Sequence, residues 1–378
     1  WARDFFASYG GQRMPWIAVQ VGASDPMKAW RPELFGQTLA ALSRQTPVGY
    51  VLIRRKSEQT PAEPAPRACR QAGGRGPLCD AVGRTTLPQL AAVLAQCRLL
   101  LTNDTGPMHL AVGVGTPVID LSVGHVDFRE TGPYGPGHWI VQPDMGCAPC
   151  GFDQVCLHHA CKDRLVPDQI AALCLHVLNG GAFPEKLTGI KIYRSRVDED
   201  GLGSTELHAG REDPTVSWYG RFWRRFWFEQ FTGRPSLVPM VSEPPPDWKE
   251  SMALLDRLMP LAARLVSRAE ELVRLTARRP LPISTLQQMQ LEESGERQTV
   301  VALSLQSPAT ASLAVALVRD THNDDGHELT GMAECRLATY RRWQNRLHTV
   351  AAGFRSFNTA QGFAPRGTTV AIPMARIG

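Results

Sequence analysis

The stretch Leu99-Leu-Leu-Thr-Asn-Asp-Thr-Gly-Pro-Met-His-Leu-Ala111 joins an apolar run to a helix-like segment through a polar turn. The apolar run predicts a β-strand over residues 98–102. The helix is expected over residues 107–114, because proline suits the first helical turn, where its missing N–H is not needed. The turn Asp104-Thr105-Gly106 therefore follows the C-terminal end of a strand. Free backbone N–H groups and the helix dipole favour an anion there, and glycine lets a phosphate approach the backbone.

Short β-rich runs alternate with helical runs on both sides of this stretch. Thr86 and Gln89 have the spacing of a capping box, which marks the start of one of the helices. Repeated alternation of this kind is typical of βαβ units, so the sequence predicts an α/β domain with a Rossmann-like, doubly wound parallel sheet. Strands are predicted at residues 16–21, 48–53, 98–102 and 117–121, and helices at residues 32–44, 87–96, 107–114 and 167–179.

Composition divides the chain into three parts. The α/β domain is expected to occupy residues 1–180, since its last helix meets a strong stop at Asn179-Gly180. Within it, residues 54–79 are rich in Pro, Gly and Arg and are predicted to form a loose surface loop. Residues 181–247 are expected to be a polar linker or arm. Residues 248–378 are predicted to be a mainly α-helical extension without a motif for chemistry.

Three segments beyond residue 181 have apolar residues at helical spacing. Two are long amphipathic runs at residues 248–279 and 334–354. In the third, residues 218–231, aromatic side chains occupy one predicted helical face and arginines occupy the opposite face. Such a helix either packs against its own protein, which is the commoner case, or docks on an anionic membrane surface.

Length, charge and composition limit the classes of function. The chain has 378 residues, of which 43% are hydrophobic, and this is enough for two or more folded domains. Its formal net charge of +5 is small and its Lys and Arg residues form no long run, so nucleic acid is not expected as a partner. The sequence has neither the apolar run of a membrane-spanning helix nor the pattern of a signal peptide. We therefore expect a cytoplasmic protein.

Two motifs of the predicted α/β domain resemble those of a known family. Asn103-Asp-Thr-Gly-Pro-Met-His-Leu-Ala111, with Gly115-Thr-Pro117 close behind, resembles the signature of glycosyltransferase family 9, the ADP-heptose:lipopolysaccharide heptosyltransferases. Residues 20–33 are similar to the family's first strand, loop and helix, although Arg31 interrupts the family's Trp-Pro pair. The resemblance covers residues 16–180. It implies the C-terminal, nucleotide-sugar-binding half of a two-domain GT-B glycosyltransferase.

The resemblance and the local chemistry together indicate donor-binding residues. In the family, a hydroxyl residue and a lysine of the first loop hold the donor diphosphate, and a glutamate after the second strand contacts the nucleoside. By its position, the acidic residue of the signature turn can accept sugar hydroxyls, and the histidine one turn later can reach the donor. The candidates are Ser24, Lys28, Glu58, Asp104, Thr105, Gly106 and His109.

Simpler interpretations of these residues exist. An Asp-Thr-Gly turn taken alone equally fits a plain helix cap, and His109 fits an interior histidine with its hydrogen bonds satisfied. A lone lysine such as Lys28 is usually a solvated side chain. Residues 128–135 are similar to the family's glycine-proline loop and form a weaker candidate for the border of the sugar site.

The resemblance implies an inverting glycosyltransferase. Its expected reaction transfers a sugar, heptose, from ADP-heptose to a lipid-linked lipopolysaccharide-core acceptor, with peripheral contact to the inner membrane and no organic cofactor. The family's general base is an Asp in a preceding N-terminal domain, which is not recognisable in this sequence, so no catalytic residue is named. The alternative from another class is a non-catalytic nucleotide-sugar-binding or scaffold protein. A dehydrogenase is disfavoured, because no Gly-x-Gly-x-x-Gly follows a predicted strand.

Four of the nine cysteines lie within fifteen residues. Cys147, Cys150, Cys156 and Cys161 begin with a Cys-x-x-Cys pair, and four thiolates at this spacing can surround a tetrahedral zinc or iron ion. Some members of the resembled family carry a similar insert, and in related protein heptosyltransferases it holds iron. The simpler alternatives are four small buried thiols or a redox pair, and His158 or His159 can replace one ligand. We expect such a metal to be structural.

Overall fold

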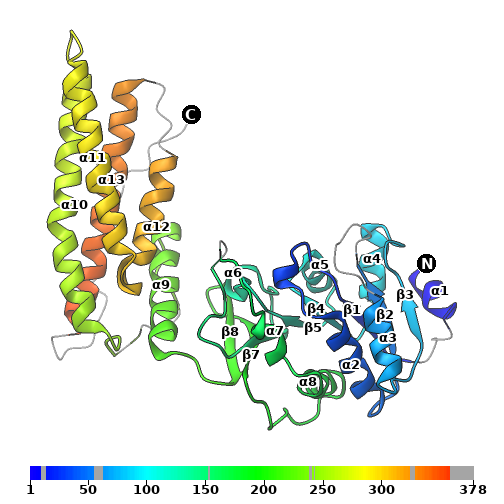
Figure 1. The fold of residues 1–378 in the computed structure, drawn as a ribbon. Coiled ribbons are helices and arrows are strands. Elements are labelled where there is room, and N and C mark those ends of the chain that lie inside the picture. The colour runs from blue at the N-terminus through cyan, green and yellow to red at the C-terminus, as the bar shows by residue number, and fades with distance from the viewer. Residues whose placement is uncertain are drawn as a thin grey trace. The chain divides into compact units, whose positions relative to one another are not determined.

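A single mixed sheet organises the first of the two compact units of the chain, Trp1–Glu212 and Asp213–Gly378 (Figure 1). The computed structural model describes residues 1–9, 14–54, 63–151, 154–237, 241, 243–323 and 328–357. In these ranges the sheet has eight strands in the order β3-β2-β1-β4-β5-β6-β7-β8. The first six strands along the chain pair in parallel, whereas β6 pairs with β7 and β7 with β8 in antiparallel fashion. The strands are β1 (Trp16–Gln20), β2 (Gly49–Ile53), β3 (Leu78–Asp80), β4 (Leu99–Asn103), β5 (Val118–Leu121), β6 (Trp139–Pro143), β7 (Ile190–Val197) and β8 (Gly203–Ala209).

Helices cover both faces of this sheet, as the doubly wound prediction requires. Alternate side chains of β1 enter different cores: Ile17 and Val19 face one, and Trp16 and Ala18 face the other. Residues of α2, α3 and α8 complete the first core, and residues of α1, α4 and α5 complete the second. The helices are α1 (Ala2–Ala7), α2 (Pro32–Ser43), α3 (Pro64–Gln71), α4 (Leu87–Leu94), α5 (Gly106–Gly113), α6 (Phe128–Thr131), α7 (Ala160–Arg164) and α8 (Pro167–Asn179), with a 3-10 turn η1 (Pro26–Lys28) after β1.

Each strand and helix predicted for this unit is present as the predicted type of element, and its ends differ from the prediction by a few residues. The capping box at the start of α4 is present, because the Thr86 hydroxyl accepts from the Gln89 N–H and the Gln89 side chain accepts from the Thr86 N–H. Gly180 ends α8 in the left-handed conformation, at φ +64°, which glycine adopts without strain.

The prediction of a loose loop over residues 54–79 was wrong. This segment contains α3 and most of β3, which adds an edge strand to β2. Its Pro64 lies in the first turn of α3, where proline is compatible with a helix. Ala65 and Cys69 of this short helix are buried against α2. Proline was therefore a helix start here and not a mark of irregular chain.

The prediction of a polar linker from residue 181 was also wrong for its first half. Strands β7 and β8 extend the sheet, so the α/β unit continues to Glu212 instead of closing near residue 180. Both are polar, because β8 forms the sheet edge and most of its side chains stay partly exposed. Only Ile190, Ile192 and Tyr193 of β7 supply buried apolar side chains. A half-exposed antiparallel pair lacks the continuous apolar run that marks the central strands.

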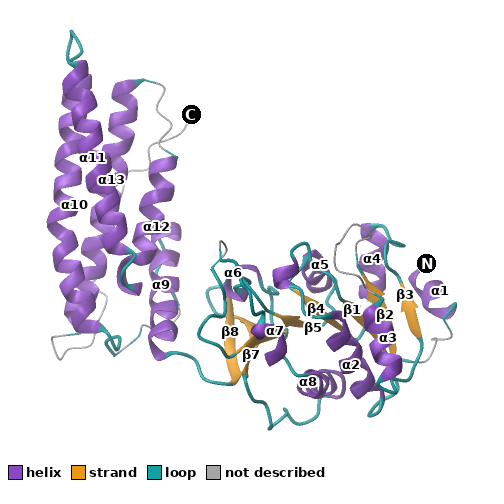
Figure 2. Cartoon of the chain, viewed as in Figure 1, coloured by secondary structure: helices purple, strands orange, loops and turns teal. Residues whose placement is uncertain are grey.

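In the second unit, every described element of regular secondary structure is a helix, and loops join the helices (Figure 2). Its apolar core is formed by side chains of all its helices and includes Leu258, Leu265, Leu317, Trp343 and Leu347. Long amphipathic helices were predicted for two of these segments, and both are present. The helices are α9 (Pro214–Thr232), α10 (Trp248–Thr276), α11 (Ile283–Ser304), α12 (Pro308–His322) and α13 (Leu329–Ser356). No described helix has the length and apolar character needed to cross a membrane.

The aromatic face of α9 packs inside its own unit. Trp218, Tyr219 and Phe226 are buried in the core. The indole N–H of Trp223 donates to the Pro308 carbonyl oxygen at 2.7 Å, and that of Trp227 donates to the Ser312 hydroxyl at 2.6 Å. The commoner interpretation of this segment is therefore confirmed. The alternative, in which the same face docks on a membrane, is not favoured, because Trp223 and Trp227 have hydrogen-bond partners in α12 and Tyr219 has one in α10.

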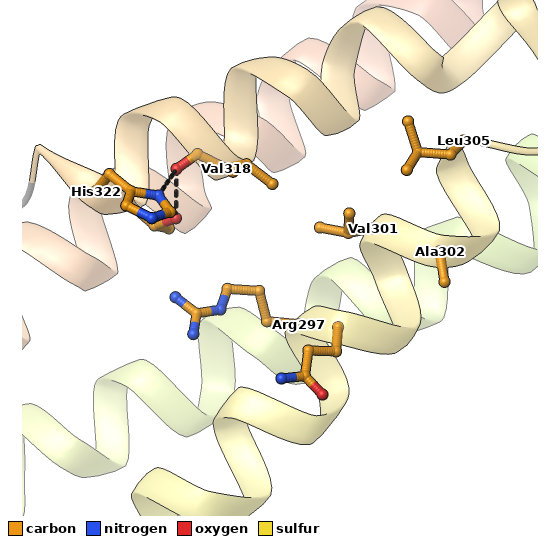
Figure 3. Close-up of a pocket in the computed structure, with 8 residues that line it drawn as sticks. Arg297, Val301, Ala302, Leu305, Val318 and His322 are labelled. Atoms are coloured by element: carbon orange, nitrogen blue, oxygen red, sulfur yellow. Dashed lines mark hydrogen bonds between the residues drawn. The ribbon is translucent and has the colours of Figure 1, made fainter. Parts of the chain in front are cut away.

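An open groove of about 440 Å³ runs between α11 and α12 (Figure 3). Val301, Ala302 and Leu305 line it from α11, and Val318 lines it from α12. The ring of His322 hydrogen-bonds back to the Val318 carbonyl oxygen at 2.8 Å, within its own helix. The groove is thus mainly apolar, and the histidine at its end is already engaged.

Candidate functional site

The strand order reverses between β1 and β4, and this is where the predicted donor residues lie. From β1 the sheet continues through β2 to β3 on one side, and from β4 through β5 to β6 on the other. The two strands run in parallel with Gln20 beside Thr102, so both end at the same edge. Helical connections leave on opposite faces at such a reversal and open a crevice, where ligands of open α/β sheets bind. Ser24 and Lys28 follow β1, and Asp104 follows β4.

Asn103 fastens the end of β4 to the loop after β1. Its side chain is fully buried. Its Oδ1 accepts from the Trp30 N–H at 2.9 Å, and its Nδ2 donates to the Gly22 carbonyl oxygen at 3.2 Å. These bonds span both ends of the loop that carries Ser24 and Lys28. A buried amide with partners on two segments fixes their spacing, because leaving either partner unpaired carries a desolvation penalty.

The loop after β1 is held by a second set of bonds. Asp25 caps η1 by accepting from the Met27 N–H at 2.8 Å, and its carboxylate lies 3.7 Å from the His125 ring. The buried Lys162 of α7 donates from Nζ to the Pro26 carbonyl oxygen at 2.6 Å. Lys28 ends η1 and is half-buried, while Ser24 is exposed. The loop therefore presents a hydroxyl and an ammonium group from a fixed backbone.

A glycine brings the loop after β5 against η1. Gly124 has φ +70°, and a Cβ at this position would collide with the Met27 carbonyl oxygen. Only glycine therefore allows the two backbones to approach this closely. The Gly124 carbonyl oxygen also accepts from the Cys150 N–H at 2.9 Å, which joins the cysteine segment to the same edge.

The signature turn leaves the start of α5 open. Thr105 is the N-cap residue of α5, but its hydroxyl donates to the Asn103 carbonyl oxygen at 3.2 Å and makes no cap hydrogen bond. Gly106 is exposed, and a Cβ there would meet no described atom within 4 Å. N–H groups at a helix start bind anions when no side chain covers them. The simpler helix-cap interpretation does not hold for Thr105, and His109 is exposed and not an interior histidine.

Asp104 is the buried acidic residue of the signature turn. It is 6% exposed, and its Oδ2 accepts from the hydroxyl of Thr131, the last residue of α6. Thr131 belongs to the 128–135 segment, which the sequence ranked only as a weaker candidate. That segment therefore reaches the site through a direct hydrogen bond, which orients the Asp104 carboxylate.

Sequence reasoning missed Asp120, the carboxylate beside this turn. Asp120 pairs in register with Thr102 and is fully buried in β5. Its Oδ2 accepts from the Ser122 hydroxyl at 2.7 Å, and its Oδ1 has no partner among the described residues. Burial, aided by the nearby Asp104 charge, raises the pKa of Asp120 to about 7, against the opposing effects of Ser122 and the Lys28 ammonium. The signal was available, since a carboxylate inside the apolar run Val118–Leu121 is unusual.

The four clustered cysteines lie near one another around Cys150. Burial raises the pKa of Cys150, and the thiols of Cys161, Cys147 and Cys156 raise it further through their charge. Cys161 is buried at the start of α7, whereas Cys147 is exposed. In the part of the chain that the structure describes, which omits residues 152 and 153, no three potential ligands converge as a metal ion requires. The donor chemistry fits a metal, and the observed arrangement is not a closed ligand set.

The structure brings most of the predicted donor residues to adjoining segments, but it does not describe all of them. Ser24 and Lys28 lie on one loop and Asp104, Thr105 and Gly106 on the adjoining turn, while His109 follows one helical turn later. Glu58 lies outside the described residues. Asn103, Thr131 and Lys162 position the site, but the sequence singled out none of them because their partners are remote in the chain. Thr131 had been included only as part of the weaker candidate segment 128–135.

The raised pKa of Asp120 predicts how pH affects stability. The folded chain holds this proton up to about pH 7, whereas an unfolded aspartic acid releases it near its model value of 3.8. Between these values the folded state binds more protons, so its stability falls as pH rises, by at most about 1.4 kcal/mol per pH unit. Asp120→Asn removes this loss. The free energy of unfolding, measured in urea, should therefore rise for Asp120→Asn relative to the parent between pH 5 and pH 8.

Asp168→Asn is the control for Asp120→Asn. Asp168→Asn changes an acidic residue in the first turn of α8, outside this site, and should show no such pH-dependent gain. A difference between Asp120→Asn and the parent that stays constant from pH 5 to pH 8 would contradict a shifted Asp120.

Comparisons with known proteins agree with the resemblance seen in the sequence. The model of Glycosyltransferase family 9 (heptosyltransferase) matches residues 2–160. Lipooligosaccharide heptosyltransferase 2 of Campylobacter jejuni is 32% identical over 96 residues, which cover 25% of this chain and 28% of that protein. The lipopolysaccharide core heptosyltransferase OpsX of Haemophilus influenzae is 46% identical over 52 residues, 14% of this chain and 15% of that protein. The chain thus spans less than a third of the length of either relative.

A search of solved structures found chains named as heptosyltransferases or glycosyl transferase family 9 proteins, each similar to part of this chain. The Escherichia coli ADP-heptose lps heptosyltransferase II has a TM-score of 0.38 and 18% identity, over 47% of this chain and 50% of that one. A glycosyl transferase family 9 protein from Veillonella parvula DSM 2008 has a TM-score of 0.31 and 28% identity, over 35% of this chain and 36% of that one. The recognition made from the sequence therefore rests on the family model, which residues 2–160 of this chain match.

Proposed function

We propose that the crevice between β1 and β4 binds the diphosphate of a nucleoside-diphosphate sugar, ADP-heptose, and that the chain serves heptose transfer to a lipopolysaccharide-core acceptor. The observation that carries the proposal is the meeting of a lysine loop and an uncovered helix start at the reversal of the strand order. The names of the relatives support the choice of sugar and acceptor. For a lipid-linked acceptor, the proposal includes a cytoplasmic location with peripheral contact to the inner membrane.

Each donor residue has a physical task in this proposal. Lys28 and the first N–H groups of α5 supply positive charge from two sides to one diphosphate. When the bond between sugar and diphosphate breaks, negative charge grows on the leaving group, and prearranged positive groups stabilise that charge most strongly. Gly106 gives the phosphate access to the backbone. The Asp104 carboxylate, oriented by Thr131, accepts hydrogen bonds from hydroxyl groups of the ribose or the sugar.

Asp120 adjusts the charge of the same crevice. An ionised Asp120 attracts the Lys28 ammonium and repels a diphosphate, whereas a protonated Asp120 does neither. Its raised pKa keeps much of it protonated near neutral pH. Donor binding and protonation of Asp120 therefore favour each other. The general base is expected, from the family resemblance, in a preceding domain, so the proposal concerns donor binding and assigns no base.

Calorimetry with ADP tests the donor site directly. Removing the Lys28 ammonium or the Asp104 carboxylate deletes a charge-assisted contact, which should weaken ADP binding by about 1.5–3 kcal/mol, on the order of tenfold to a hundredfold. Lys28→Ala and Asp104→Ala should both show this loss. Lys186→Ala changes an exposed lysine of the same unit and should bind ADP as the parent does. Unchanged ADP affinity in Lys28→Ala and Asp104→Ala would place the site elsewhere.

We also propose that Cys147, Cys150, Cys156 and Cys161 hold one structural zinc or iron ion. The support is their donor chemistry and the closeness of the other thiols to Cys150. The ion would tie the segment before α7 to the loop after β5, which the Cys150 N–H already contacts. It would take no part in the reaction.

Elemental analysis of protein purified without added metal tests this second proposal. The parent chain should carry close to one equivalent of zinc or iron, and Cys150→Ser should lose most of it because a tetrahedral site needs its fourth thiolate. Cys335→Ser alters an exposed thiol of the helical unit and should keep the metal. Less than about a tenth of an equivalent in the parent, with all thiols reactive, would rule the metal site out.

A further inference from the structure

The helical unit contains a polar pocket of about 460 Å³ that has no part in the proposed donor site. Residues of α9, α12 and α13 line it. Its described lining includes the guanidinium groups of Arg319, Arg342 and Arg346 and the carboxylate of Asp320. Three positive charges against one negative charge give these described lining residues a net charge of +2. A pocket with this excess favours an anion over a neutral ligand.

Asp320 lies within ion-pair range of all three arginines, but its single negative charge offsets only one of their positive charges. Its Oδ1 accepts from Arg319 Nη2 at 3.1 Å, and its Oδ2 accepts from Arg346 Nη1 at 3.0 Å. Arg342 Nε lies 3.9 Å from the same Oδ2, within ion-pair range but beyond a hydrogen bond. Each guanidinium has five N–H donors, so one carboxylate leaves most of the donors of the three groups for other acceptors.

Arg346 is the group that most needs an anion. It is 8% exposed, and its Nε has no hydrogen-bond partner among the described residues. Its guanidinium carbon lies 5.1 Å from the centre of the Trp227 ring, which holds the charge against an aromatic face. Burial lowers the pKa of Arg346, and the Arg342 and Arg319 charges lower it further against the opposing effect of Asp320. A buried charge with such incomplete pairing is costly unless a ligand completes it.

We propose that this pocket binds the phosphoryl group of a phosphorylated ligand. Guanidinium forks match phosphate oxygens with paired N–H donors, and a cluster of them binds phosphate more selectively than lysines do. Asn323 and Thr339 also line the pocket with polar side chains, and the Phe231 ring forms part of its wall. The phosphoryl group belongs either to a soluble molecule or to a lipid headgroup, which share this chemistry.

The exposed thiol of Cys335 lines the pocket and reports on its occupancy. The experiment measures the rate at which iodoacetamide alkylates Cys335 in the full chain, mapped by mass spectrometry. One arm adds millimolar pyrophosphate, a second adds phosphatidylcholine vesicles containing phosphatidylglycerol, and a third adds sodium chloride at matched ionic strength. Because the readout is local to Cys335, it does not depend on whether the proposed donor site binds ADP.

The proposal expects severalfold slower alkylation with pyrophosphate, with the anionic vesicles, or with both, and no such change with sodium chloride. Protection by pyrophosphate alone identifies a soluble ligand, and protection by the vesicles identifies a headgroup. Arg342→Gln should abolish the protection, whereas Arg341→Gln should keep it. The two side chains are neighbours in α13 and are 54% and 57% exposed, but Arg341 pairs with Glu270 and does not line the pocket. Equal rates in every arm, or protection that survives Arg342→Gln, would overturn the proposal.

Discussion

The amide of Asn103 joins the end of β4 to both ends of the loop that follows β1, and the candidate site depends on this connection. A parallel sheet brings the carboxyl ends of its strands to one edge, but it does not fix the loops beyond them. Here the buried amide fixes one loop, the Lys162 ammonium braces it, and Gly124 lets the loop after β5 approach its backbone. Lys28 and the open start of α5 are thereby held at the same edge of the sheet.

The sequence predicted what depends on local pattern. Apolar runs gave the buried central strands, and the proline and glycine of the signature turn located the start of α5 and its anion-favouring amides. It failed where tertiary structure overrides composition. Pro64 opens a helix that α2 buries, and the polar strands β7 and β8 gain order by pairing with β6. The sequence offered one sign of Asp120, an acidic residue inside an apolar run, but the neighbours that affect its pKa are brought together only by folding.

The two units differ in the buried charged groups at their candidate sites. In the α/β unit, one buried carboxylate, Asp120, interacts with the Lys28 ammonium and the Asp104 carboxylate, so its protonation changes the charge of the candidate site. In the helical unit, the described lining of the pocket has an excess of positive charge, because the Asp320 carboxylate forms ion pairs with three arginines. Each arrangement leaves a buried polar atom unpaired among the described residues, Asp120 Oδ1 in one and Arg346 Nε in the other. Unpaired buried atoms are rare in proteins and usually have a reason such as a ligand or a proton.

Hydrogen–deuterium exchange of the chain with and without saturating ADP tests the central claim, that the loop after β1 and the start of α5 form one diphosphate site. Bound phosphate oxygens accept hydrogen bonds from backbone N–H groups at a helix start and slow their exchange. The account predicts slower exchange in peptides covering residues 22–30 and 103–109, with no change in α10. ADP binding that protects other segments of the chain and leaves these two unchanged would contradict it.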